Sequence, residues 1–279
     1  FEVINIGTSV LCSQYLGARM HKNMVQVVGV SLILNLVFGL FVSAILHYGA
    51  TSLLSMMGLR PELMEYGVSY MKIVGVFAFF QAISLTISAS LRSANKAVYP
   101  MMVTVVVNIL NIIGNYSLIF GKFGMPALGV EGAAISTAFA RGVSMVILFV
   151  ILFRKHIPRF PLSYFCPFPF VELKNLLKIG VPSAGENMSY SFSQVVLTYF
   201  INMLGNEALA TRTYVVNIVM FVYLFAIAMA QGGAICIGHL VGERKIHAAY
   251  LLGKYVMRIS ILVSLVLSCI WAVSYTHLR

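Results

Sequence analysis

The chain has 279 residues, of which 60% are hydrophobic and 10% are charged. A typical soluble domain has about 25% charged residues, so the composition excludes an ordinary soluble domain and favours a membrane protein. The formal net charge of +11 does not favour nucleic-acid binding, because the basic residues occur in short segments between apolar runs rather than in one patch.

The apolar runs have the length of transmembrane helices. A helix crosses the bilayer core with about 20 apolar residues, whereas a membrane barrel strand alternates over about 10. Helices also satisfy their own backbone hydrogen bonds, as lipid surroundings require. We therefore predict an all-α polytopic membrane protein with eight transmembrane helices: Phe1–Leu16, Met24–His47, Gly67–Leu91, Val98–Phe120, Ala127–Phe153, Gly180–Leu204, Glu207–Ile237 and Ala249–Val273.

A Pro-rich connection follows the fifth span. Within it, Val171–Ile179 carries Lys174 and Lys178 on one helical face and leucines on the other. This pattern is typical of a short helix that lies in the membrane interface. The predicted domains are an N-terminal lobe at 1–153, a cytoplasmic inter-lobe loop with this helix at 154–179, and a C-terminal lobe at 180–279.

The basic residues are distributed unequally between the two sides that alternating loops define. One side receives only Arg60, Lys122 and Arg212. Lysine and arginine are enriched in cytoplasmic loops, so the richer side is predicted to be cytoplasmic. That side receives Arg19, Lys22, Arg92, Lys96, Arg154, Lys155, Arg159, Lys174, Lys178, Arg244 and Lys245.

Two segments of the chain have similar sequences. The segment Ser13–Arg19 resembles Gly238–Arg244, which aligns Gly17 with Gly242 at an offset of 225 residues. Both segments end an apolar run in the same direction, so they predict a parallel repeat of two six-helix lobes, an arrangement common in transporters. On this prediction the protein has twelve spans, and the chain lacks the first and the last three. The alternative is two unrelated helix ends.

Ionisable residues inside spans are candidates for function, because their burial in lipid is costly. The sequence has no Asp, and Glu2 and Glu186 fall within spans. Tyr190 shares the helix face of Glu186, and Gln194 lies on the adjacent polar stripe. A carboxylate with oxygen neighbours can exchange a proton or coordinate a hard cation, so both Glu residues are ion-coupling candidates. The alternative for Glu186 is a protonated or paired structural role.

Further polar residues lie in the fourth and fifth spans. Asn108, Asn111 and Asn115 recur on one face of the fourth span, and Arg141 lies deep in the fifth. Amide side chains contribute about 0.6 kcal/mol each when they bond across membrane helices, so these residues either join helices or line a cavity. Arg141 either pairs with a carboxylate, lines an aqueous path or has a structural role.

The sequence favours neither enzymatic nor metal chemistry. It has no HExxH motif and no glycine-rich loop ending in GK[ST], so an ion gradient is a simpler energy source than ATP. We expect the protein to have no enzymatic activity, no metal site and no cofactor. The expected coupling ion is H⁺ or Na⁺. The expected partners are a small organic substrate and membrane lipid, without nucleic acid or an obligate protein partner. The cysteines lack paired spacing: Cys12, Cys166, Cys236 and Cys269.

The chain has characteristic segments at Leu91–Met101, Asn111–Gly121, Gly124–Ala134, Gly180–Pro182, Leu204–Gly205, Ala208–Ala210 and around Gly17 and Gly242. These segments resemble the multidrug and toxic compound extrusion (MATE) transporters. They cover nearly the whole chain, as the second through ninth of that family's twelve helices. The chain departs from the family pattern where Asn95 replaces a usual Gly and Asn115 a frequent Asp, and where Glu186 follows Pro182 by one turn instead of two.

The resemblance implies antiport of organic, often cationic, compounds against H⁺ or Na⁺. The implied mechanism is alternating access between two lobes, in a bacterial plasma membrane. A lipid-linked oligosaccharide flippase of the same MOP flippase superfamily is the first alternative. It would need a wide, strongly cationic cavity, for which Arg141 is the one clear candidate. A membrane channel is a weaker alternative, because the predicted two-lobe repeat argues against it.

Overall fold

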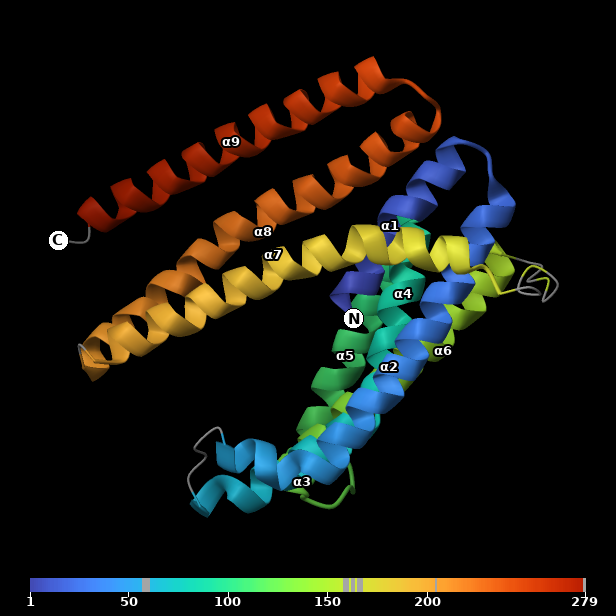
Figure 1. Ribbon diagram of the computed structural model, residues 1–279. Coiled ribbons are helices and arrows are strands. Elements are labelled where there is room, and N and C mark those ends of the chain that lie inside the picture. Colours follow the sequence, from blue (N-terminus) through green and yellow to red (C-terminus); the bar gives the residue numbers. More distant parts are fainter. Residues whose placement is uncertain (57–60, 158–160, 162–163, 165–167, 204, 278–279) are drawn as a thin grey trace. The chain divides into compact units, whose positions relative to one another are not determined.

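The computed structural model describes residues 1–56, 61–157, 161, 164, 168–203 and 205–277. These residues form helices joined by short turns and no strand, which agrees with the predicted all-α class (Figure 1). The elements in chain order are α1 (Glu2–Gly17), α2 (His21–Met56), α3 (Pro61–Val76), α4 (Ala78–Ser93), α5 (Val98–Phe120), α6 (Gly129–Ile151), the π-helical turn η1 (Leu152–His156), α7 (Phe170–Asn202), α8 (Asn206–Gly242) and α9 (Ile246–His277).

The helices group into two compact units. The first unit comprises Phe1–Cys12 and His21–Gly180, and the second comprises Ser13–Met20 and Val181–Arg279. Both α1 and α7 therefore contribute residues to each unit. These units do not follow the predicted domain boundaries, which remain a prediction.

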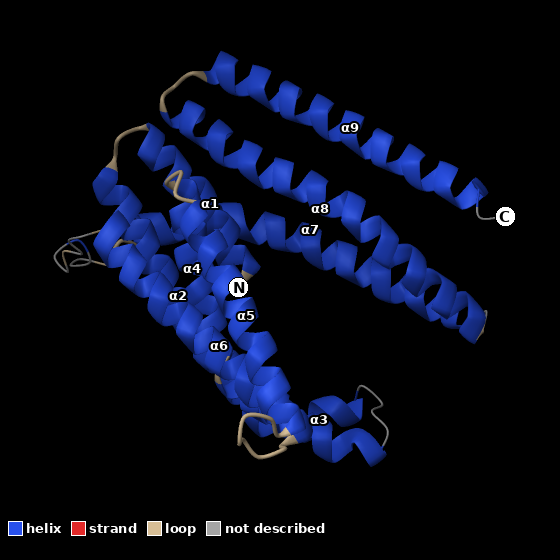
Figure 2. Ribbon diagram, turned by 180° about the vertical axis from the view of Figure 1, so that it is seen from behind, coloured by secondary structure: helices blue, strands red, loops and turns tan. Residues whose placement is uncertain are grey.

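The first unit is built around α2, α4, α5 and α6, which lie side by side in both views (Figure 1; Figure 2). Helices α5 and α6 are joined by a turn in which Gly121 has a left-handed φ of 66°. A Cβ at Gly132 of α6 would collide with the Leu118 carbonyl oxygen of α5. Small residues allow such close approach between membrane helices, which explains the glycine at this position.

The second unit contains the α8–α9 hairpin, beside which the C-terminal part of α7 lies (Figure 1). Arg212 was expected in an outer loop, but the structure places it in the second turn of α8. There its guanidinium donates to the Oε1 atom of Gln194 on α7 at 2.8 Å and also to the hydroxyl of Thr198. The position of Arg212 therefore serves the packing of α7 against α8.

Two predicted elements need correction. The third span was predicted as one helix, Gly67–Leu91, but it is divided at Phe77 into α3 and α4, which form an angle of 46°. The short helix predicted at Val171–Ile179 is the beginning of α7, which continues through Pro182 to Asn202. The fourth span, in contrast, has the predicted bounds Val98–Phe120.

The described residues support a multi-pass membrane protein. Five of their helices are long and apolar enough to cross a membrane, or six if α3 and α4 count as one bent span. The count of eight spans is not reached by this criterion and stays a prediction. Three residues with predicted roles, Arg60, Arg159 and Cys166, lie outside the described residues.

Candidate functional site

A polar cavity lies between α4, α5 and α6 of the first unit. Its volume is ≈ 490 Å³, and ligand pockets commonly measure about 300–1,000 Å³. It contains two of the predicted cavity residues, Asn108 and Arg141. The lining residues are Gln81, Ser84, Leu85, Ser88, Arg92, Ala97, Pro100, Met101, Thr104, Val105, Val107, Asn108, Arg141, Ser144 and Leu148.

The polar lining follows from helical spacing. On α4, Ser84, Ser88 and Arg92 follow one another at intervals of four residues, so their side chains share one face. Thr104 and Asn108 have the same spacing on α5. Polar side chains from all three helices therefore line the same cavity. The sequence analysis identified Asn108 and Arg141 as cavity residues but not the stripe on α4.

The cavity is positively charged. Arg92 and Arg141 are both half-buried, and no described carboxylate lies within salt-bridge distance of either guanidinium. Glu2 at the beginning of α1 is within electrostatic range of Arg92 but does not line the cavity. The pairing of Arg141 with a carboxylate, one of its three predicted roles, is therefore absent from the described residues.

Of the other two asparagines of α5, Asn111 joins α5 to α6, and Asn115 bonds within α5. Asn111 donates to the Thr137 hydroxyl of α6 at 3.3 Å, and its carbonyl oxygen accepts a hydrogen bond from Ser136 at 3.2 Å. Asn115 donates to the side chain of Asn111 at 3.0 Å. The contacts of Asn111 are of the helix-joining kind, one of the two alternatives of the sequence analysis, whereas the bond of Asn115 stays within α5. Asn108 alone of the three lines the cavity between α4, α5 and α6.

A buried polar network joins α1, α2 and α4. The amide of Asn35 donates to the side-chain oxygens of Asn5 and Thr86, and Thr8 donates to Ser31 at 2.6 Å. The Nδ2 atom of Asn5 and the Oδ1 atom of Asn35 have no hydrogen-bond partner among the described residues. The sequence analysis missed this network, because its members are 23 to 81 residues apart.

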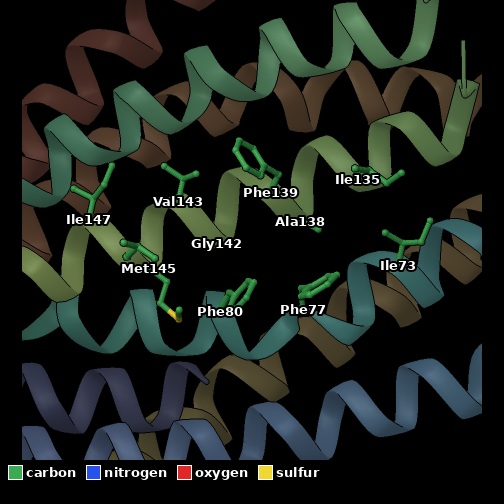
Figure 3. A pocket seen from close by; sticks show the side chains of 11 residues that line it. Ile73, Phe77, Phe80, Ile135, Ala138, Phe139, Gly142, Val143, Met145 and Ile147 are labelled. Atoms are coloured by element: carbon green, nitrogen blue, oxygen red, sulfur yellow. The ribbon is translucent and has the colours of Figure 1, made fainter. Parts of the chain in front are cut away.

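An apolar groove lies on the same unit, between α6 and the break at Phe77 (Figure 3). Phe77 and Phe80 stack on each other with centroids 5.4 Å apart and point towards α6. Gly142 leaves room for Phe80, whose ring lies 3.2 Å from where a Cβ would be. No polar side chain lines the groove among the described residues, so its chemistry is that of a lipid-facing surface.

The predicted ion-coupling residues lie apart from these cavities. Glu186 and Tyr190 are both exposed on α7, with Gln194 on the same helix, in the second unit. Glu2 is the first residue of α1 and is exposed in the first unit. A carboxylate in the first turn of a helix interacts favourably with the helix dipole. The predicted roles of these residues stay predictions.

The two similar segments have the same local structure. In each, the helix ends in three backbone hydrogen bonds, from Ala18, Arg19 and Met20 in one and from Glu243, Arg244 and Lys245 in the other. The acceptors also correspond at the offset of 225 residues: Gln14, Leu16 and Tyr15 in the first segment, and His239, Val241 and Leu240 in the second. Arg19 and Arg244 have left-handed φ values of 57° and 61°.

The same two segments cross each other within the second unit. A Cβ at Gly17 would collide with the His239 carbonyl oxygen, and a Cβ at Gly242 would collide with that of Gln14. Gln14 and His239 are counterparts at the offset of 225 residues, so the crossing is symmetric. A Cβ at Gly238 would likewise collide with Ser13, its own counterpart. The glycines permit contact between the two backbones.

The turn after α8 carries one further ionic contact. The Lys245 ammonium bonds the Glu243 carboxylate at 2.7 Å. This hydrogen bond, assisted by the lysine charge, holds the pKa of Glu243 below its usual value. The pair is exposed and therefore contributes little to stability.

Comparison with known proteins gives a consistent result. The sequence model of the MatE family matches residues 2–117 and 182–279. An uncharacterized transporter of Bacillus subtilis, YisQ, is 42% identical over 250 residues, which is 90% of this chain and 55% of YisQ. The probable multidrug resistance protein NorM of Thermotoga maritima is 29% identical over 81% of this chain and 49% of its own length. The chain thus spans about half the length of the curated relatives it matches.

A solved structure supports the same fold. A multidrug resistance MATE family transporter of the MOP superfamily, in an outward-facing conformation, superposes with a TM-score of 0.85 at 26% sequence identity. The superposition covers 96% of this chain and 59% of that protein. The likeness therefore extends over both units of the chain.

Proposed function

The chain belongs to the MATE family of membrane transporters, and on this premise we propose that the protein exports organic compounds by alternating access. The energy source is a gradient of H⁺ or Na⁺, and the location is a bacterial plasma membrane. The observation that carries the proposal is the cavity of ≈ 490 Å³, lined by polar groups, among helices that otherwise expose apolar side chains.

The coupling ion is assigned to Glu186, with Tyr190 and Gln194 beside it on α7. The support is chemical. The polar residues next to Glu186 on α7 are neutral. Protonation of the Glu186 carboxylate, or binding of a cation to it, therefore changes the charge of that region. Glu2 is the second candidate, on α1.

The two predicted lobes supply the moving parts. We assign α1 to the N-terminal lobe and α8 to the C-terminal lobe, so that their symmetric crossing at Gly17 and Gly242 is the point where the lobes meet on the cytoplasmic side. Substrate release to the outside then occurs with this crossing closed, and substrate entry requires it to part. The basic residues Arg19 and Arg244 in the two turns support the cytoplasmic assignment.

A lipid-linked oligosaccharide flippase is the second candidate function. The observation in its favour is that Arg92 joins Arg141 in the cavity, which makes the cavity more cationic than the sequence indicated. The two candidates differ in substrate: a flippase moves an anionic lipid, whereas an exporter moves soluble organic compounds.

The test uses inverted membrane vesicles that contain the protein expressed from its complete gene. Uptake of a cationic dye, ethidium, and of an anionic dye, fluorescein, is followed under a proton gradient and then under a sodium gradient. Uptake of either dye that depends on a gradient supports export and identifies the ion. Absence of uptake for both dyes under both gradients rejects export, and a translocation assay with lipid-linked sugars then tests the flippase.

A further inference from the structure

We propose that the cavity between α4, α5 and α6 binds the anionic group of an organic substrate through Arg92 and Arg141. This inference rests on the proposed export function and specifies the charge of the substrate, which is opposite to the cationic compounds that the resemblance implied. The anionic group is a carboxylate, sulfonate or phosphate, and the rest of the substrate is apolar.

The first argument is charge. The described residues that line the cavity include two arginines and no Asp or Glu. Arg141 lies inside α6, where a cationic side chain is costly and is normally paired or placed in a water-filled cavity, and Arg92 lies in the last turn of α4. Here no described carboxylate lies within salt-bridge distance of either guanidinium, and Glu2 interacts with Arg92 only at longer range. A substrate anion would supply the missing opposite charge.

The second argument is the set of hydrogen-bond donors. The guanidinium fork offers several N–H groups in a geometry that matches carboxylate and phosphate oxygens. Around the arginines, hydroxyls of Ser84, Ser88 and Ser144 line the cavity. Hydroxyls can donate to an anion as well as accept. The cavity therefore presents donors from α4 and α6 to a single ligand group.

The third argument excludes the opposite substrate charge. Proteins hold organic cations with carboxylates or with aromatic faces. The described lining of this cavity contains neither, since its apolar members are aliphatic or Met, Pro and Ala. An organic cation would meet two like charges there and no compensating group. The aromatic residues of the unit lie instead in the groove at Phe77 and Phe80.

The apolar part of the substrate also has a place. Leu85, Val105 and Leu148 come from α4, α5 and α6 and line the cavity together with the polar groups. Ligand pockets typically combine such an apolar surface with a few polar groups that fix orientation. The cavity therefore suits an amphiphilic anion better than a small inorganic one.

The test compares two dyes of similar shape and opposite charge. Fluorescein is the anion, and the methyl ester of tetramethylrhodamine is the cation. The protein, expressed from its complete gene, is placed in nanodiscs of zwitterionic phosphatidylcholine, and binding is measured by fluorescence anisotropy. We expect fluorescein to bind more tightly, and Arg141→Gln and Arg92→Gln each to weaken its binding by about tenfold or more.

Two further variants make the result specific. Lys72→Gln removes a positive charge from the exposed face of α3, outside the cavity, and should leave fluorescein binding unchanged. Arg141→Lys keeps the charge and should recover part of the binding that Arg141→Gln loses. Tighter binding of the rhodamine ester overturns the proposal. So does fluorescein binding that is equal in Arg141→Gln, Arg92→Gln and Lys72→Gln.

The source of the anion is distinguished by competition. Displacement of fluorescein when the nanodiscs contain phosphatidylglycerol identifies a lipid headgroup as the ligand class, and its persistence identifies a soluble organic anion. Both results support an anion site. Because binding needs no gradient, fluorescein binding without gradient-driven uptake supports the site and rejects export, whereas ethidium uptake without fluorescein binding supports export and overturns the site.

Discussion

At the residue scale, Asn35 shows how a polar side chain is kept inside the helix bundle. It is fully buried, and its amide donates hydrogen bonds to the side-chain oxygens of Asn5 on α1 and Thr86 on α4. The sequence marks each of these residues as polar within an apolar run, but it does not reveal that they meet. Asn108 and Arg141, in contrast, could be predicted as cavity residues, because a polar group deep in a span is costly unless it faces protein or water.

Removal of the Asn35 amide should destabilise the first unit. In Asn35→Leu, the buried side-chain oxygens of Asn5 and Thr86 lose the hydrogen bonds that the Asn35 amide donates to them. The free energy of unfolding should therefore fall by about 1–2 kcal/mol. Thermal unfolding of the purified protein measures the change. Asn187→Leu is the control, because Asn187 is exposed on α7 and bonds only the Ser183 carbonyl among the described residues. Equal stability of the two variants would contradict a structural role of the network.

Glu186→Gln tests ion coupling. The amide keeps the size of the side chain but cannot exchange a proton or carry a negative charge, so gradient-driven export should fall to the level of vesicles without the protein. The variant should still insert into the membrane. Glu131→Gln is the matched control, because Glu131 lies in the first turn of α6, where it only favours the helix dipole. Full export by Glu186→Gln would remove this residue from the mechanism.

At the scale of elements, prediction succeeded where local patterns decide the helix ends. The bounds Val98–Phe120 agree with α5, which ends at Gly121 with a left-handed φ. It was wrong at Phe77, where no proline marks the break and ring packing between Phe77 and Phe80 accompanies it. The prediction that a span begins at Gly180 was also wrong, because Gly180 lies inside α7. A Cβ there would collide with the Val3 carbonyl oxygen, so tertiary contact explains this glycine.

The crossing of α1 and α8 predicts a difference between two glycines of the second unit. Gly242→Ala should lower the free energy of unfolding by about 1–3 kcal/mol, because the new methyl group meets the backbone of Gln14, which cannot move aside as a flexible side chain can. Gly253→Ala should be neutral or slightly stabilising, since its nearest atom would be Ile237 Cδ1 at 3.7 Å. Thermal unfolding of both variants gives the comparison, and equal midpoints would show that the crossing is not tightly packed.

At the scale of the whole molecule, composition and hydropathy were sufficient for the membrane class and, with the motifs, for the family. They could not supply the cationic cavity, because it is formed by side chains from three helices that only the fold brings together. The predicted two-lobe repeat depends on one short sequence match. The matching hydrogen bonds of the two turns, and their symmetric crossing, support it as a proposal.

A reversible crosslink can test whether this crossing parts during transport. A Cβ on Gly238 would lie 2.9 Å from the Cβ of Ser13, slightly less than the roughly 3.5–4.5 Å of a disulfide. A small separation of α1 and α8 would therefore allow Ser13→Cys and Gly238→Cys to bond. The experiment starts from a variant in which all four native cysteines are replaced by serine. Oxidation should stop export, and a reductant should restore it.

The matched control is the pair Gly114→Cys and Ser136→Cys. Here a Cβ on the glycine would lie 3.2 Å from the Cβ of the serine, between α5 and α6 of one hairpin. This pair stays together when the lobes move as rigid bodies, so its crosslink should leave export unchanged. Continued export with the bond between positions 13 and 238 formed would show that the crossing stays closed, and would place the entry of substrate elsewhere. Loss of export only with that bond would establish the crossing as the cytoplasmic closure.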